Sequence, residues 1–190
     1  MANKTVVIID RGGRGAALVY KYSQSPQVKQ IIAIPGNELM AINLTVPVKI
    51  FPDLKTTSIK EIIAVCKKFK ADLIDVAQDD AVEAGLVDRL TEQNFNVLGP
   101  TKEAGQIEWD KAWARDFMKK YNLPIPKYIV CKSQLDGISF VKKYPNKKWF
   151  IKAAGLAGGK GVIPAENIDQ AIEAIKGMSE FGKSGKGSRR

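Results

Sequence analysis

Short apolar runs, separated by stretches with helical spacing, dominate the first hundred residues of the chain. The apolar runs predict strands at residues 6–9, 28–34, 48–51, 73–76 and 96–98. Helical spacing predicts helices near residues 16–20, from Ser58 onward and over 81–93. Ser58 is the expected N-cap of its helix, and Glu61, three positions later, completes a capping box. Strands that alternate with helices are typical of a parallel sheet covered on both faces, so we predict a Rossmann-like α/β fold.

The spacing changes after residue 100. Thr101 and Asp110 are candidate caps of two further helices, and two prolines, Pro124 and Pro126, then interrupt the chain as at a domain boundary. Beyond the prolines the pattern predicts strands at 128–130, 149–152 and 162–163 and helices at 134–143 and 168–178. We therefore predict a Rossmann-like domain over residues 1–100, connecting helices over 101–123 and a second, smaller subdomain over 124–190.

Charge is distributed unevenly along the chain. The 190 residues carry a formal net charge of +10, and 45% of them are hydrophobic, which is typical of a folded globular protein. Residues 1–100 hold 12 basic and 11 acidic side chains, whereas residues 101–190 hold 18 and 9. A strongly basic region such as residues 101–190 is common in nucleic-acid-binding proteins. The tryptophans Trp109, Trp113 and Trp149 are not interleaved with lysines as stacking platforms would be, so we do not expect a nucleic-acid partner.

Several classes of protein are excluded by the residues that the chain lacks. No apolar run approaches the roughly 18 residues that cross a bilayer, and the first residues do not resemble a signal peptide. Histidine is absent, which excludes histidine triads and the common zinc sites. Cys66 lies on the apolar face of a predicted helix and is expected to be a buried structural thiol, while Cys131 is the second cysteine. This cysteine usage fits a reducing cytoplasm.

A glycine cluster follows the first predicted strand. Residues 10–15 read Asp-Arg-Gly-Gly-Arg-Gly, and glycines at this point allow backbone amides and a helix N-terminus to approach an anion. The spacing is not that of a dinucleotide fingerprint, and no acidic residue ends the second strand to hold a ribose. Two interpretations remain open: a ligand-binding loop, or a tight turn that requires glycine.

A second glycine-rich loop follows the predicted strand at 149–152. Lys152 ends this strand, and the loop contains Gly155, Gly158, Gly159, Lys160 and Gly161. It is not a P-loop, because no Ser or Thr follows the lysine and a strand comes next. A solvated hairpin loop is one interpretation. The two lysines favour the other, a lid that covers a triphosphate with point charges and backbone donors.

These residues resemble a known family, the phosphoribosylamine–glycine ligases (glycinamide ribonucleotide synthetases). The resemblance runs over nearly the whole chain and rests on motifs in the same order: Gly12-Gly13-Arg14, Pro35-Gly36-Asn37, residues 84–88, Leu98-Gly99-Pro100-Thr101, Lys111 with Phe117-Met118-Lys119, and residues 150–162. The last of these segments resembles the family's ATP-covering loop and is the most specific. The resemblance implies an ATP-grasp ligase, in which a Rossmann-like domain precedes the nucleotide clamp, so residues 124–190 would be a partial ATP-grasp lid subdomain.

The resemblance also implies roles for single residues. Lys111 and Lys152 would contact ATP, the loop with Gly155, Gly158, Gly159, Lys160 and Gly161 would close over its phosphates, and Gly12, Gly13 and Arg14 would contact the substrate. The family uses Mg²⁺ and ATP to phosphorylate the glycine carboxylate, which the amine of phosphoribosylamine then attacks. The family's metal-binding carboxylates lie in sequence after its ATP-covering loop, so we expect this chain to be inactive unless a complementary C-terminal fragment is supplied.

The chain departs from the family pattern in both loops. Around Gly12-Gly13-Arg14 the family has a Gly-Ser-Gly-Gly-Arg-Glu-His-Ala type of loop, whereas this chain has Asp10, Arg11, Gly15 and Ala16. Residues 77–79 read Ala-Gln-Asp where the family has a Gly-Pro-Glu motif. Ala154 replaces the aspartate of the family's Lys-Ala-Asp-Gly motif, which begins here at Lys152. A degenerate nucleotide- or phosphate-binding module without ligase activity is therefore the alternative function.

Asp10 places a carboxylate where the family has glycine. At an effective dielectric of about 20–80, a negative charge a few ångströms from a bound phosphate costs about 1–4 kcal/mol. Arg11 and Arg14 have two ways to offset this cost: they pair with Asp10, or they face the phosphate. We expect the first, in which case the substrate site is impaired.

Overall fold

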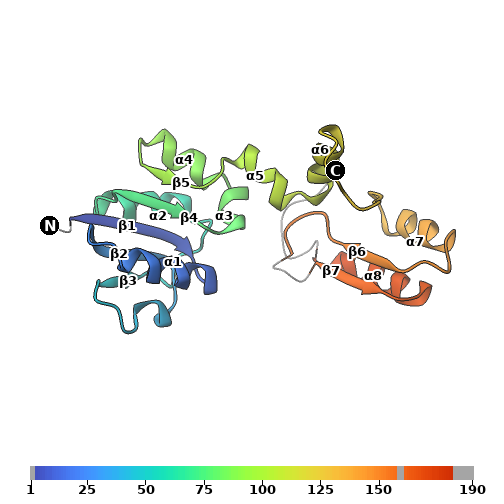
Figure 1. Ribbon diagram of the computed structural model, residues 1–190, viewed down its shortest axis with the longest axis horizontal. Coiled ribbons are helices and arrows are strands. Elements are labelled where there is room, and N and C mark those ends of the chain that lie inside the picture. The colour runs from blue at the N-terminus through green and yellow to red at the C-terminus, as the bar shows by residue number, and fades with distance from the viewer. Residues whose placement is uncertain (1–2, 158–160, 182–190) are drawn as a thin grey trace. The chain divides into compact units, whose positions relative to one another are not determined.

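The chain forms two compact units, Met1–Gly105 and Gln106–Arg190, in a computed structural model that describes residues 3–157 and 161–181 (Figure 1). Each unit has its own sheet and its own apolar core. Within the described residues, no helix is both long enough and apolar enough to cross a bilayer.

The N-terminal unit contains a parallel sheet of five strands in the order β3-β2-β1-β4-β5. The strands are β1 (Lys4–Asp10), β2 (Val28–Pro35), β3 (Val48–Ile50), β4 (Leu73–Val76) and β5 (Val97–Leu98). The helices are α1 (Gly13–Ser23), the 3-10 helix η1 (Glu38–Ala41), α2 (Ile59–Lys68), α3 (Asp79–Glu83), α4 (Leu86–Glu92) and α5 (Lys102–Trp109), which runs into the second unit. This strand order confirms the Rossmann-like prediction, and it reverses direction between β1 and β4, where such folds bind ligands.

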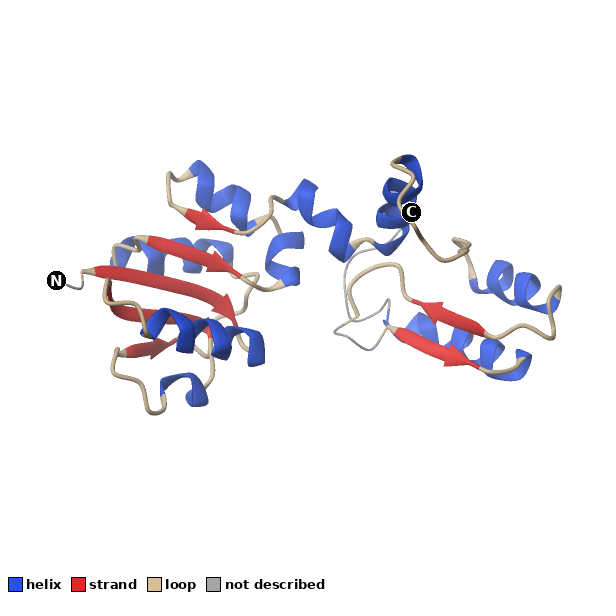
Figure 2. Cartoon of the chain, viewed as in Figure 1, coloured by secondary structure: helices blue, strands red, loops and turns tan. Residues whose placement is uncertain are grey.

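Side chains of β1 alternate between the two faces of the sheet. Val6 and Ile8 pack against Val19 of α1, whereas Ile9 points to the opposite face, where α2 lies (Figure 2). Cys66 of α2 is fully buried, and burial raises the pKa of its thiol to about 12. The prediction that Cys66 is a buried structural thiol is confirmed.

Two predicted features of the helices are wrong. The helix expected over 81–93 is divided into α3 and α4, because Gly85 adopts a left-handed conformation (φ 82°) that an uninterrupted helix cannot contain. Ser58 does precede α2, but its hydroxyl accepts a hydrogen bond from the amide of Lys55 (3.2 Å) and caps no helical amide. Thr101 and Asp110, by contrast, accept hydrogen bonds from amides of the helices that follow them.

The C-terminal unit packs helices against one face of an antiparallel pair of strands. Its further elements are α6 (Lys111–Lys120), α7 (Gln134–Lys142), β6 (Trp149–Lys152), β7 (Val162–Ala165) and α8 (Ile168–Phe181). Trp149 and Ile151 of β6 pack on Val141 of α7 and on Ala171 and Ile175 of α8. The core of this unit is therefore small and one-sided.

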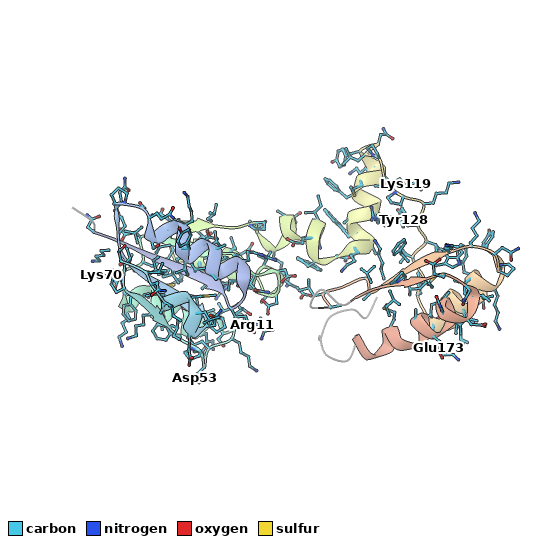
Figure 3. All side chains as sticks on the ribbon, turned by 60° about the horizontal axis from the view of Figure 1, so that its bottom comes forward. Arg11, Asp53, Lys70, Lys119, Tyr128 and Glu173 are labelled. Atoms are coloured by element: carbon cyan, nitrogen blue, oxygen red, sulfur yellow. The ribbon has the colours of Figure 1, made fainter. Side chains whose placement is uncertain are left out.

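The strand predicted at residues 128–130 is absent from both sheets of the described structure, so that prediction is wrong. Among the described residues, no strand lies beside this segment to pair with its backbone groups. It is held instead by Tyr128, labelled in Figure 3, whose hydroxyl donates a hydrogen bond to Asp116 of α6 (2.7 Å).

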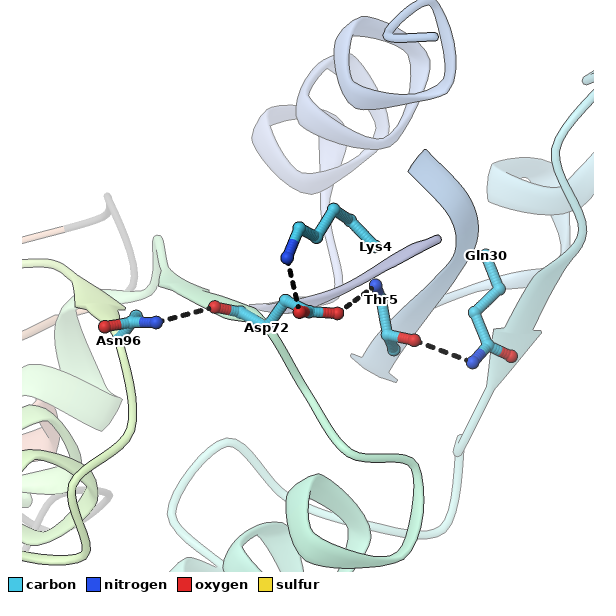
Figure 4. Close-up of polar contacts among 5 residues, drawn as sticks. All are labelled: Lys4, Thr5, Gln30, Asp72 and Asn96. Atoms are coloured by element: carbon cyan, nitrogen blue, oxygen red, sulfur yellow. Dashed lines mark hydrogen bonds and ion pairs between the residues drawn. The ribbon is translucent and has the colours of Figure 1, made fainter. Parts of the chain in front are cut away.

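A polar network closes the amino end of the parallel sheet (Figure 4). The Asp72 carboxylate accepts from the backbone amide of Thr5 (2.8 Å) and from the Lys4 ammonium (3.0 Å). The side chain of Gln30 bonds the Thr5 hydroxyl (2.8 Å), and that of Asn96 bonds the Asp72 carbonyl (3.1 Å). These contacts join the starts of three strands to the segment before β5, and the amide of Thr5 is the main reason that the pKa of Asp72 is lowered.

We predict that Asp72→Asn lowers the free energy of unfolding by about 1 kcal/mol at neutral pH, because the amide and ammonium lose a charged acceptor that is partly exposed to solvent. A lowered folded-state pKa means that the stabilisation is complete above the ordinary pKa and is lost as the pH falls through the lowered value. The difference between parent and variant, measured by urea unfolding with circular dichroism, is therefore expected to shrink below about pH 4. Asp53→Asn, at an exposed position, is the control. An equal difference at pH 7 and at pH 3 would contradict this account.

Candidate functional site

The first glycine turn lies at the carboxyl end of β1. Asp10 is the last residue of β1 and is 2% exposed. Its carboxylate Oδ1 accepts hydrogen bonds from the backbone amides of Gly12 (2.5 Å) and Gly15 (3.1 Å). The first of these amides precedes α1 and the second lies in its first turn, so the carboxylate lies at the N-terminus of the helix, where the helix dipole favours a negative charge.

Neither nearby arginine pairs with Asp10 among the described residues, so the expected pairing is wrong. The Arg14 guanidinium donates to the carbonyl oxygen of Ala77, which follows β4. Arg11 lies exposed at the turn, as labelled in Figure 3. Two backbone amides are sufficient partners for a buried carboxylate at a helix N-terminus, which is why the arginines are not needed there.

Pro35-Gly36-Asn37 supports this turn from the neighbouring strand. The amide of Gly36 bonds the Asp10 carbonyl (3.1 Å), and the Asn37 side chain donates to the Arg11 carbonyl (2.8 Å). Gly36 has φ 68°, and a Cβ there would lie 2.8 Å from the Cβ of Ala33, so glycine is required. The resemblance to the ligase family singled out these three residues, but their structural role in fixing the first turn was not predicted.

The second glycine loop begins at the end of β6. Lys152 pairs with Val162 of β7, and Phe150 pairs with Pro164. Directly paired residues of an antiparallel ladder point to the same side. All four are exposed and lie opposite the face that packs on α7 and α8. We call this surface, formed by Phe150, Lys152, Val162 and Pro164, the open face.

Lys111 attaches α6 to the second loop. Its backbone amide donates to the Ala154 carbonyl (2.8 Å), and its ammonium donates to the Gly155 carbonyl (3.0 Å). The structure therefore brings together Lys111 and Gly155, two residues that were predicted to contact ATP, and Lys152 precedes Gly155 by three positions on the same segment. The Lys152 ammonium makes no hydrogen bond or ion pair with any described residue and is available to a ligand.

The loop closes at Gly161. The Ala153 amide bonds the Gly161 carbonyl (2.8 Å), and a Cβ at residue 161 would lie 2.5 Å from the Cβ of Ala157 and 3.1 Å from that of Ala153. Glycine is thus required for close approach of the two ends of the loop. Gly158, Gly159 and Lys160, which were predicted to cover ATP phosphates, lie outside the described residues.

A second buried carboxylate of the N-terminal unit, that of Asp75, is bonded by a tyrosine. The Tyr22 hydroxyl of α1 donates to the Asp75 carboxylate of β4 (2.9 Å). Burial, with the neighbouring carboxylate, raises the pKa of Tyr22 to about 12, and burial also raises the pKa of Asp75. This pair fastens α1 to the sheet. The described residues contain no group of three or more acidic or cysteine side chains that could hold a metal ion.

Comparison with known proteins places both units in one family. Residues 4–108 match the family model described as phosphoribosylglycinamide synthetase, N domain, and residues 109–190 match that of the ATP-grasp (A) domain of the same synthetase. The chain belongs to the phosphoribosylglycinamide synthetase family. This finding confirms the resemblance seen in the sequence, and it assigns the open face and the second loop to the ATP-grasp part of that family.

Relatives within the phosphoribosylglycinamide synthetase family are longer than this chain. A phosphoribosylamine–glycine ligase from Archaeoglobus fulgidus is 34% identical over 186 residues, which cover 95% of this chain and 40% of that protein. A trifunctional purine biosynthetic protein from Drosophila melanogaster is 37% identical over 95% of this chain and 14% of its own length. The crystal structure of a phosphoribosylamine–glycine ligase from Thermotoga maritima, 26% identical, has a TM-score of 0.62 and covers 89% and 38% of the two chains.

We predict that Gly161→Ala destabilises the C-terminal unit by about 1–3 kcal/mol, because the new methyl group overlaps two alanine side chains. Gly177→Ala in α8 is the matched control: nothing lies within 4 Å of its Cβ position, and alanine favours a helix by up to about 1 kcal/mol. All three tryptophans lie in the C-terminal unit, so tryptophan fluorescence during urea unfolding reports on that unit alone. Equal stability of the two variants would show that the loop does not close as described.

Proposed function

We propose that the chain is the part of a phosphoribosylamine–glycine ligase that contacts ATP. The observation that carries this proposal is the open face, where the exposed ring of Phe150 and Lys152, whose ammonium has no partner among the described residues, lie beside a loop held by Lys111. An apolar ring with two ammonium groups provides contact for a base together with charge for phosphates. Membership of a family whose matched domain is named ATP-grasp supports the same ligand.

The proposed reaction joins glycine to phosphoribosylamine at the expense of ATP. Phosphoryl transfer from ATP to the glycine carboxylate gives an acyl phosphate, which the amine attacks to form an amide and release phosphate. Catalysis of such transfer depends on positioning and on neutralising the negative charge of the phosphates. In this chain Lys111 and Lys152 would supply positive charge, and the loop from Gly155 to Gly161, including Gly158, Gly159 and Lys160, would exclude water from the phosphates.

Magnesium is the cofactor expected with ATP in this proposal, but the described residues offer no cluster of carboxylates for it. We therefore propose that the ligands of Mg²⁺ come from a region corresponding to the remainder of the longer relatives. A complementary C-terminal region of this kind is the proposed partner, glycine and phosphoribosylamine are the proposed substrates, and the cytoplasm is the proposed location. That Gly12, Gly13 and Arg14 bind substrate stays a prediction.

We predict that the 190-residue protein binds Mg-ATP weakly and that Lys152→Met weakens this binding about tenfold or more, because a hydrogen bond to a charged group contributes about 1.5–3 kcal/mol. Lys147→Met, which removes an exposed lysine of the same unit, is the charge-matched control and is expected to have little effect. Isothermal titration calorimetry at physiological salt gives the dissociation constants. Tight, Mg²⁺-dependent binding that is indifferent to Lys152→Met would place the nucleotide site elsewhere.

We further predict that the 190-residue protein releases no ADP in a glycine- and phosphoribosylamine-dependent reaction unless a C-terminal fragment of a ligase relative is added. With the fragment, activity is expected for the parent and for Lys147→Met, and little for Lys152→Met. Substrate-dependent ADP release by the 190-residue chain without the fragment would contradict the proposal that catalysis requires a C-terminal region. ATP binding without activity in any mixture would favour the alternative, a nucleotide-binding module that is not a ligase.

A further inference from the structure

The N-terminus of α1 already holds an anion that belongs to the chain itself. Of the amides at the start of this helix, those of Gly12 and Gly15 converge on one oxygen of the Asp10 carboxylate, at 2.5 and 3.1 Å. Converging amides at a helix N-terminus are the donors that Rossmann-like folds offer to a phosphate after their first strand. In this chain those donors are engaged by a side chain from β1.

The fit of this carboxylate is close and depends on Gly15. A Cβ at residue 15 would lie 2.7 Å from Asp10 Oδ1 and 2.8 Å from Asp10 Cβ, so no other residue is compatible with Asp10 in this position. Asp10 is 2% exposed, and no lysine or arginine among the described residues forms an ion pair with it. Its charge is therefore stabilised by the turn and is not neutralised by a cation.

A side chain also joins the ends of β1 and β4 beside this turn. The sheet reverses its order between β1 and β4, and in such folds a ligand binds outside the carboxyl ends of the two strands. Here the Arg14 side chain reaches from α1 to the Ala77 carbonyl after β4. A phosphate that binds at this end of the sheet would displace that contact and would lie within a few ångströms of a buried negative charge, which repels it.

We propose that Asp10 is a specificity-determining residue that fills the anion position of the first turn, so that the turn does not accept a phosphate group. A ligand bound at this end of the sheet would then be uncharged or cationic where it contacts residues 10–15, and the phosphate of a phosphorylated substrate would bind at another place. This proposal rests on the N-terminal unit alone and does not depend on where ATP binds.

The test uses the full 190-residue chain, with ribose 5-phosphate as the probe and ribose as the probe without phosphate. Asp10→Asn keeps the shape and the acceptor oxygen but removes the charge, whereas Asp10→Gly removes the side chain. Asp53→Asn, an exposed carboxylate of the same unit, is the matched control. Binding is followed by the amide NMR signals of Gly12, Gly13 and Gly15, and circular dichroism checks that each variant is folded.

The expected result is that ribose 5-phosphate shifts these glycine signals in Asp10→Gly at concentrations at least tenfold lower than in the parent or in Asp53→Asn. Ribose is expected to show no such difference. A gain in Asp10→Asn as well would assign the exclusion to charge, and a gain in Asp10→Gly only would assign it to occupancy; both support the proposal. If Asp10→Gly does not fold, Asp10→Asn decides. Equal binding by parent and variants, or none by any folded variant, would overturn the proposal.

Discussion

Burial of β1 on both faces and along both edges is the constraint on which the N-terminal unit depends. The four residues from Val6 to Ile9 are at most 3% exposed, and β1 pairs with β2 on one side and β4 on the other. Because side chains alternate along a strand, a register fixed by these apolar residues also fixes the side to which Asp10 points. Asp10 follows Ile8 on the face of α1, and the burial of β1 thereby places a carboxylate beneath the N-terminus of that helix.

In the C-terminal unit, by contrast, the sheet is covered on one face only. Trp149 and Ile151 pack on helices, whereas Phe150 and Lys152 on the alternate positions remain exposed. Exposed apolar side chains that gather on one surface are typical of a binding site. The same strand thus provides core packing with one set of side chains and a surface for a ligand with the other, and the attachment of Lys111 to the loop keeps the end of that surface in place.

Much of the fold could be predicted from the sequence, because the strands of the N-terminal unit are short, mostly apolar segments that alternate with stretches of helical spacing. The prediction of a strand at residues 128–130 was wrong, because an apolar run does not reveal whether a neighbouring strand is present to pair with it. The division of one helix at Gly85 was also missed, because a single glycine inside a helical pattern is often tolerated. In the candidate site, Lys152 and the glycine loop were singled out from residue type and spacing, and Lys111 was singled out from the resemblance to the ligase family; their contact with ATP stays a prediction. The partners of Asp10 were not, because whether a carboxylate meets an arginine or a backbone amide depends on geometry that spacing does not contain.

The most direct measurement of where the nucleotide binds is protection of lysines from chemical labelling. Reductive methylation with and without Mg-ATP, read out by mass spectrometry, compares every lysine of the chain in one experiment. Our account predicts protection of Lys111 and Lys152, with no change at Lys4 or Lys49 of the N-terminal unit. Protection confined to lysines of the N-terminal unit, with Lys152 labelled equally in both conditions, would contradict it.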